Sequence, residues 1–384
     1  MIIKLKREST KKCLNRDKFS LYKFFQIYFF FIFFFLIKLL NANECASTSP
    51  LKIGLIDNDN IDYQHYLYYE LGNYAAKKNL EFEIEIVKNN SNKFDIIFGE
   101  YFDLIKLSQN EINYPKEVQK FYIENGIKIL NNTLPLDLDT FIIVSNNVDK
   151  KINSLEELYN YYDPIRYTLG MNLKSDNYIA KIIGYNTEYK EFNFQSVINE
   201  TLINYLGKTY KNLNKNILSS NFFEVYNSYE NDENVYTLFS DGVLLNKNFD
   251  YITYQLFPQT KYKWDDKKGI FVNRLGLTPL SYYGFSAYIN KTNQFGFLCH
   301  MIKKNIRKNS FKNFNIALSP LSVTEIEDFD FIPEGYLEIL KNKNKNILDI
   351  NFDNYAFKSE SLRNIIYGNE KYQKVIDTNN YLNK

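Results

Sequence analysis

Residues 94–101 read FDIIFGEY, and this stretch decides the fold that the sequence predicts. The apolar run Phe94–Phe98 is typical of a buried strand, and a helical pattern begins at Phe102 directly after it. Two further strands are expected before it, at Leu51–Ile56 and at the strictly alternating Phe82–Val87, with apolar residues at helical spacing between them. The order strand, helix, strand, strand, helix with short loops predicts an α/β layered domain with a largely parallel sheet.

The same alternation continues along the chain. Ser154 and Glu157 have the spacing of a capping box, which predicts a helix start. A helix is expected over 294–306, a loop that carries Trp264 over 259–275, and a mainly helical tail over 320–384. The further predicted strands are Phe141–Ser145, Tyr167–Met171, Val235–Phe239, Phe249–Phe257 and Gly284–Ile289.

The N-terminus has the three parts of a secretory signal peptide. Residues 4–23 are rich in Lys and Arg, residues 24–37 read FFQIYFFFIFFFLI, and small residues follow near Ala42. We therefore expect residues 1–42 to be removed and the mature protein to be exported, with the periplasm as its location. The alternative is a membrane anchor formed by residues 24–40, although Lys38 interrupts the apolar run early for a spanning helix.

Composition limits the classes of function. A mature chain of this length suits two domains, and a formal net charge of +2 without a basic stripe gives no sign of nucleic acid binding. An exported protein also lacks a pool of ATP or NAD(P)H, so we expect no cofactor. The many Tyr and Phe residues carry little weight, because A/T-rich codons would enrich them together with Asn, Lys and Ile.

Two cysteines, Cys45 and Cys299, remain after the predicted cleavage. Export permits disulfides. Cys299 lies within an apolar helical pattern and Cys45 in what reads as a flexible tail, so the sequence favours a buried free thiol at Cys299. A disulfide between the two stays open as the alternative.

The sequence holds no recognisable catalytic motif. His65 and His300 are its only histidines, and neither neighbours a nucleophile motif. A His/Cys metal site lacks ligands. The carboxylates at Asp57, Asp59 and Asp62 follow calcium-loop spacing only weakly and are explained more simply by helix capping and solvation. We therefore expect neither an enzyme nor a metal site.

Several segments, in their order along the chain, resemble a known family. The strand at Phe94–Tyr101 is similar to the family pattern F-D-[VI]-[VI]-x-[GA], and Phe239–Gly242 is similar to its F-x-x-G turn. Phe141–Ser145 with the helix after it, and Tyr283–Asn290 with the helix after it, follow at the expected places. Over roughly residues 50–340 the chain resembles the extracellular solute-binding proteins of ABC importers, with the sugar-binding family closest and the polyamine-binding family next.

The resemblance implies a type II architecture with two lobes joined by hinge strands, followed by a helical C-terminal tail. Lobe one would hold residues 50–140 and 276–315. Lobe two would hold residues 145–255 and 316–384. The chain would cross between the lobes near 139–146 and near 252–258. The protein would act as a monomer that captures a small solute in the cleft and delivers it to the membrane subunits of the transporter. A sugar is the expected solute, and a polyamine or another cationic solute is the alternative.

Candidate contacts to the solute lie at strand ends that converge on such a cleft. Carboxylates could accept hydrogen bonds from a sugar, and flat aromatic rings could cover its apolar face; the same groups would also suit a polyamine. Helix capping is the alternative for Glu100 and Asp241, and core or surface packing is the alternative for the rings. Tyr101 and Asp241 are expected to lie outside the core, so that their replacement would weaken binding and change stability little. The predicted ligand-binding residues are Asp59, Glu100, Tyr101, Asp241, Trp264, Tyr282 and Tyr283.

The sequence leaves two other classes of function open. One is an exported hydrolase of unrecognised family, which would need a nucleophile or a carboxylate pair that the sequence does not reveal. The other is a membrane-tethered, non-catalytic interaction protein, which residues 24–40 would favour if they stayed attached.

Overall fold

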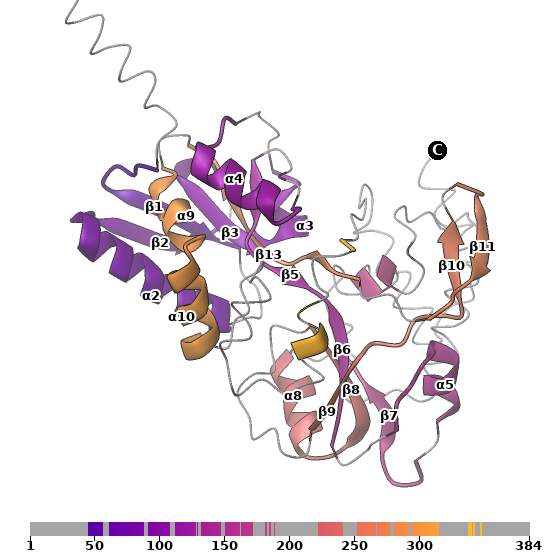
Figure 1. The fold of residues 1–384 in the computed structure, drawn as a ribbon. Helices are drawn as coiled ribbons and strands as arrows, with labels where there is room; N and C mark the ends of the chain where they lie inside the picture. Colours follow the sequence, from indigo (N-terminus) through magenta and orange to yellow (C-terminus); the bar gives the residue numbers. More distant parts are fainter. Residues whose placement is uncertain are drawn as a thin grey trace, which may run out of the picture.

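The 384-residue chain is described by a computed structural model that covers residues 45–314 with gaps, together with a few residues between 337 and 347. The longest gaps are 172–180, 189–221 and 241–251. The predicted signal peptide and most of the predicted helical tail lie outside the described residues. Two groups of strands, each with its own helices, form two lobes (Figure 1).

Lobe one is built on a five-stranded sheet with the order β2-β1-β3-β13-β4. The strands β1, β2 and β3 run parallel, whereas β13 runs antiparallel to both of its neighbours. Because β13 follows all of lobe two in the sequence yet lies between β3 and β4, the chain must leave this lobe and return to it. The strands are β1 (Leu51–Leu55), β2 (Phe82–Ile86), β3 (Ile96–Glu100), β4 (Thr133–Pro135) and β13 (Phe285–Ile289).

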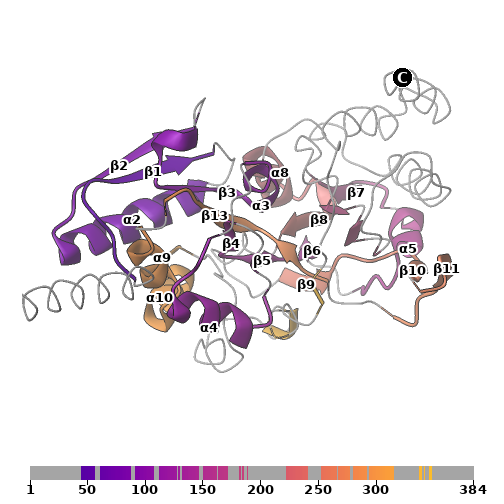
Figure 2. The same cartoon turned by 90° about the horizontal axis from the view of Figure 1, so that it is seen from above.

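Helices pack on this sheet and enclose its core. Figures 1 and 2 show α2, α9 and α10 side by side along one face of the sheet. Successive residues of a strand point to opposite faces of the sheet. Ile53 of β1 and Phe98 of β3 point to the same face and pack into the main core together with Leu67 of α2 and Phe297 of α9. The helices of lobe one are α2 (Ile61–Lys78), α3 (Tyr101–Leu104), α4 (Lys116–Glu124), α9 (Gly296–Met301) and α10 (Lys304–Phe314), with a short 3₁₀ helix at Ser91–Lys93. The helix predicted over 294–306 is thus two helices.

Lobe two holds a four-stranded sheet with the order β7-β8-β6-β9, in which β6 pairs antiparallel with β8 and β9. The predicted capping box is confirmed, since the Ser154 side chain accepts a hydrogen bond from the amide of Glu157 at 3.2 Å and starts α5. The elements are α5 (Leu155–Asn160), α8 (Phe222–Glu230), β6 (Phe141–Asn146), β7 (Tyr167–Gly170), β8 (Asn234–Ser240) and β9 (Ile252–Leu256).

Two very short strands, β5 (Leu138–Asp139) and β12 (Tyr282–Tyr283), join the lobes as an antiparallel pair. The chain passes from β4 through β5 into β6 and returns through β12 into β13. The second crossing therefore lies at β12, and the predicted crossing near 252–258 is wrong. Those residues include β9, which pairs with β6 inside lobe two. We name the β5–β12 pair the hinge ribbon.

The segment after β9 also differs from its prediction. Residues 259–275 were expected to form a loop, but they contain a hairpin of β10 (Tyr262–Asp265) and β11 (Ile270–Asn273). Gly269, with φ of 62°, lies in its turn and adopts the left-handed backbone that glycine permits. Both strands have only four residues, and Tyr262 and Ile270, whose side chains are described, are exposed, so these residues give no pattern of a buried strand.

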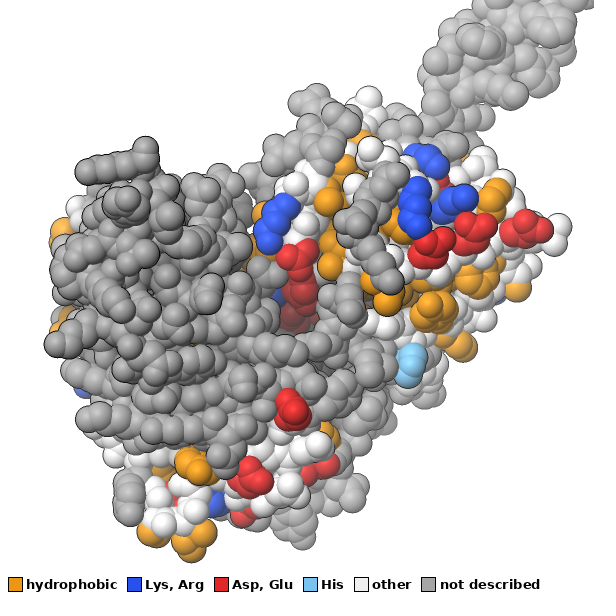
Figure 3. Space-filling view, turned by 180° about the vertical axis from the view of Figure 1, so that it is seen from behind, with side chains coloured by type: hydrophobic (Ala, Val, Ile, Leu, Met, Phe, Trp, Pro, Cys, Tyr) orange, Lys and Arg blue, Asp and Glu red, His pale blue; other side chains and the backbone are white. Residues whose placement is uncertain are grey.

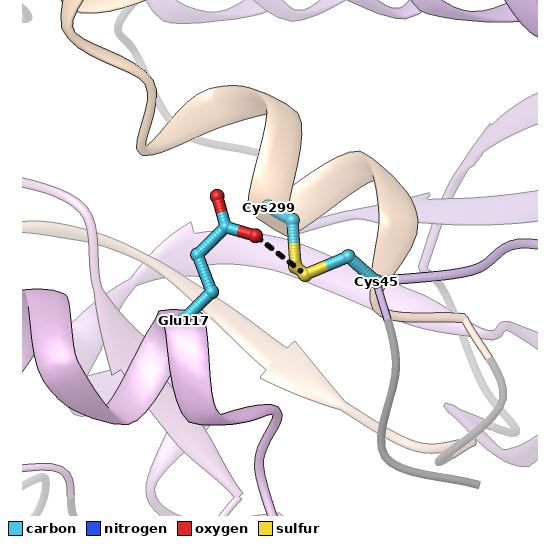
Figure 4. Close-up of a disulfide and its surroundings, with 3 residues drawn as sticks. All are labelled: Cys45, Glu117 and Cys299. Atoms are coloured by element: carbon cyan, nitrogen blue, oxygen red, sulfur yellow. Dashed lines mark hydrogen bonds between the residues drawn. A yellow bond between two sulfur atoms is a disulfide. The ribbon is translucent and has the colours of Figure 1, made fainter. Parts of the chain in front are cut away.

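Cys45 and Cys299 form a disulfide, so the expected free thiol at Cys299 is wrong (Figure 4). The segment before β1 lies against α9, because the amide of Gly296 donates a hydrogen bond to the carbonyl of Ala46 at 2.7 Å. The side chain of Gln294 binds Thr48 in the same place. The expectation failed because these contacts, which fix the segment beside Cys299, leave no apolar pattern in the sequence.

A small part of the tail reaches the hinge ribbon. The amide of Ser281 donates to the carbonyl of Asn346 at 2.9 Å, and Ile347 packs against the core of lobe one. The packing of residues 316–384 on lobe two and the domain boundaries given by the sequence stay predictions.

Candidate ligand-binding site between the lobes

Carboxylates gather at the hinge ribbon. Asp137 directly precedes β5 and Asp139 is its last residue, and Asp137 accepts a hydrogen bond from the Tyr63 hydroxyl of α2. Gly284 makes room for them, since a Cβ atom there would lie 2.6 Å from Asp139 Oδ2. Glu100 ends the neighbouring strand β3 and pairs with Phe285 of β13, the residue after Gly284. Figure 3 shows acidic side chains set back in a hollow near the middle of the opposite face.

The negative charges of these carboxylates help to raise the pKa of Tyr63. Burial first, and then the negative charges of Asp137, Asp139 and Glu100, hold the pKa of the Tyr63 hydroxyl well above its ordinary value. The hydroxyl therefore stays protonated and donates to Asp137. Its ring is fixed by stacking on Phe285 with centroids 4.3 Å apart. Three carboxylates from two segments of the chain, residues 137–139 and the end of β3, thus raise the pKa of one buried hydroxyl.

Glu100 makes a contact that joins the two lobes. Its carboxylate accepts a hydrogen bond from the ammonium group of Lys181 at 2.7 Å. Lys181 lies in the sequence between β7 and β8, which are both strands of lobe two. The Lys181 side chain is only 6 % exposed and that of Glu100 is 27 % exposed, so water screens this ion pair much less than a surface pair.

Two aromatic rings also lie close to the ammonium group of Lys181. Its Nζ atom lies 4.6 Å from the ring centroid of Tyr282 and 5.3 Å from that of Phe102. These distances are those of cation–π contacts, in which the negative face of a ring attracts a cation. Tyr282 belongs to the hinge ribbon and Phe102 to α3. One carboxylate and two ring faces therefore surround an ammonium group.

The structure places the predicted site residues in different surroundings. Glu100 precedes α3, but its side chain makes no capping hydrogen bond, which removes the capping alternative. Tyr282 faces Lys181. Tyr101 is 1 % exposed and packs with Tyr283 in the core of lobe one, centroids 4.7 Å apart. The expectation that Tyr101 lies outside the core is therefore wrong, because α3 begins at this residue and turns its ring inward.

Three predicted site residues receive no test from the structure. Asp59 and Asp241 lie outside the described residues, as does Asp57. The backbone of Trp264 forms part of β10 and pairs with Phe271 of β11, and nothing is described of its side chain. Contacts of these residues with a solute stay predictions.

Asp137, Asp139, Tyr63 and Lys181 were missed by sequence reasoning. A signal was present for the two aspartates. Residues 134–140 read LPLDLDT, and a spacing of two places both carboxylates on one side of an extended segment. Their chemistry was overlooked because the segment was interpreted only as the approach to a strand. Lys181 gives no comparable signal.

The described residues hold one group of possible metal ligands close enough to share an ion, namely Cys45, Glu117 and Cys299. Both sulfur atoms are joined in the disulfide, with Glu117 Oε2 3.3 Å from Cys45 Sγ (Figure 4). A metal binds thiolates, so this group offers no thiolate ligand while the disulfide is intact.

Among the helices that the structure describes, none combines the length and apolar character needed to cross a membrane. The apolar run 24–40 lies outside the described residues.

Comparison with solved structures identifies the fold. The chain is similar to the spermidine/putrescine ABC transporter substrate-binding protein PotD from Streptococcus pneumoniae, with a TM-score of 0.56 and 14 % identity over 85 % of this chain and 100 % of that one. It is also similar to the cyclic α-maltosyl-1,6-maltose binding protein from Arthrobacter globiformis, with a TM-score of 0.52 and 10 % identity over 85 % and 96 % of the chains. No family model and no curated protein sequence matches the chain.

The chain therefore has the two-lobe α/β fold of ABC transporter solute-binding proteins, and the fold class predicted from its sequence is confirmed. The insertion of β13 between β3 and β4 and the hinge ribbon are the topological basis of the two lobes.

Proposed function

We propose that this chain is the exported solute-binding component of an ABC importer and that it captures a cationic solute of the polyamine class between its lobes. The observation that carries the proposal is the convergence of Glu100, Asp137 and Asp139 at the hinge ribbon. Polyamines carry ammonium groups separated by short apolar chains, which carboxylates and ring faces bind well. The ammonium group of Lys181 already pairs with one of these carboxylates, that of Glu100.

Binding would change the arrangement of the two lobes and would not alter the solute chemically. A solute that contacts both lobes favours the closed arrangement, and the membrane subunits of the transporter would distinguish the loaded from the empty protein by this closure. The proposal contains no catalytic step, in agreement with the prediction from the sequence. Export by the N-terminal segment, a periplasmic location and action as a monomer belong to the same proposal.

A neutral sugar, which the sequence resemblance placed first, is the second candidate. Carboxylates beside the ring of Tyr282 also suit sugar hydroxyls and the apolar face of a sugar ring. One of the two similar structures is that of a maltosyl-sugar binding protein. The three clustered carboxylates place the cationic solute ahead, because several negative charges at close range attract a cation, whereas a neutral sugar gains nothing from their charge.

Thermal unfolding and calorimetry test the proposal with putrescine, spermidine, glucose and maltose. A bound solute stabilises the native state by RT ln(1 + [L]/Kd), about 2.7 kcal/mol at a hundredfold excess over Kd. The variant Asp139→Asn should weaken binding of the polyamine roughly 10- to 150-fold, as expected for a charged hydrogen bond worth about 1.5–3 kcal/mol.

The matched control is Glu83→Gln, which removes one negative charge on the exposed strand β2, where Glu83 pairs with Lys52 at 3.4 Å. It should leave affinity unchanged. A rise in melting temperature with the sugars alone would support the second candidate, a neutral sugar. The absence of any shift at millimolar concentrations of all four compounds would refute the proposed function.

A further inference from the structure

The side chain of Lys181 occupies surroundings that would suit the end of a ligand. Its ammonium group donates to Glu100 at 2.7 Å and lies over the rings of Tyr282 and Phe102. The rings belong to different segments of the chain, the hinge ribbon and α3. An alkyl stem that ends in a charged amine is also the chemical form of each end of a polyamine.

This burial needs compensation. Removing an ammonium group from water costs several kcal/mol unless a partner of opposite charge and good geometry offsets it. The carboxylate and the two ring faces supply that partner, and Lys181 is among the most buried charged residues of the described chain. The surroundings that the structure describes therefore suit a cation.

We infer that Glu100, Phe102 and Tyr282 form a subsite for a primary ammonium group, and that Lys181 fills this subsite in the absence of solute. The inference rests on the proposed function and deepens it. Lys181 comes from lobe two and its partners come from lobe one and the hinge ribbon, so the side chain acts as a tethered competitor of the solute.

A tethered competitor has a quantitative consequence. A cationic solute must first expel Lys181, and its apparent affinity is reduced by the fraction of molecules in which the subsite is vacant. The apparent affinity falls about tenfold for each 1.4 kcal/mol by which the state with Lys181 in the subsite is more stable than the state with the subsite vacant. Small monoamines bind too weakly to compete, because the lysine is present at the high effective concentration of a tethered group. Lys181 would thus set a threshold that favours solutes with several ammonium groups.

The experiment uses Lys181→Ala with n-butylamine as the probe and n-butanol as its neutral counterpart. The variant should have a lower melting temperature than the wild type. Millimolar butylamine should raise its melting temperature in a saturable manner, and butanol should not. Wild-type protein should not respond to butylamine, and putrescine should bind the variant at least about tenfold more tightly than the wild type.

The matched control is Lys291→Ala. Lys291 also pairs with a buried carboxylate, Asp95, at 2.5 Å, but among the described residues it makes no cation–π contact. It should show neither rescue by butylamine nor a gain in putrescine affinity. Equal responses of the two variants, or no rescue of Lys181→Ala, would show that the Lys181–Glu100 pair is only structural and would overturn the inference.

A second measurement needs no variant. Amine-reactive labelling of the wild type, read by mass spectrometry, should find Lys181 protected in the empty protein and reactive when putrescine is bound. Continued protection with putrescine bound would overturn the inference even if Lys181→Ala does not fold. If no polyamine binds the wild type, the proposed function fails, whereas rescue by butylamine still reports on the subsite alone.

Discussion

Removal of the disulfide should destabilise the protein by about 2–5 kcal/mol. Cys45 and Cys299 are separated by 254 residues, and a cross-link over a loop of this length restricts the unfolded chain by about 5.5 kcal/mol in the chain-entropy treatment. If lobe two stayed folded while lobe one unfolded, residues 141–256 would not count as flexible loop. This would roughly halve the loop and lower the effect by only about 0.6 kcal/mol. Measured values usually fall below this limit.

The assay is urea unfolding at neutral pH, followed by circular dichroism, of Cys45→Ser, Cys299→Ser and the double variant. A Cys13→Ser background excludes exchange with the third cysteine of the full chain. Because all three variants lose the same bond, each should lose a similar amount of stability. The reasoning is refuted if alkylation of unfolded, unreduced protein labels two thiols, or if the double variant lies within about 0.5 kcal/mol of its parent.

Three further outcomes are expected. Tyr101→Ala should lower the free energy of unfolding by about 3–5 kcal/mol, because the ring is buried in the core of lobe one; a normal urea midpoint would contradict this. Burial raises the pKa of Tyr63 and Tyr66 well above their ordinary value, so the folded state keeps protons that the unfolded state loses, and stability should fall as pH rises above about 10. Ultraviolet titration should then show tyrosine ionisation together with unfolding, rather than before it. Mass spectrometry of the exported protein should find an N-terminus near Ala42, and one at Met1 would support the anchored alternative.

The sequence was informative where one local pattern decides the structure. The apolar run at Phe94–Phe98 predicted β3 with Glu100 at its end, and Ser154 predicted the start of α5, because strand burial and helix capping depend on residues a few positions apart. The hairpin within residues 259–275 was missed, since strands of four residues each are too short to establish an apolar alternation.

The site was less predictable because it depends on distant segments. Whether Lys181 meets Glu100 depends on how two lobes face each other, which no local pattern contains. Tyr101 was assigned to the cleft on its place after a strand, but the helix that begins there turns its ring toward Tyr283 instead. The aspartates of residues 134–140 had a readable spacing, yet their nearness to Tyr63 became clear only when α2 was placed beside the hinge ribbon.

The disulfide also decides how the protein bears mechanical load. A pull on the N-terminal segment, whether from a membrane anchor or from the export machinery, reaches the folded protein at residue 45 before it reaches β1. The covalent bond carries that force into α9, deep in the helical layer of lobe one, and the hydrogen bonds that join β1 to β2 and β3 are spared from shear. Such a force would therefore load lobe one alone, and tension at the N-terminus would not itself drive the lobes apart.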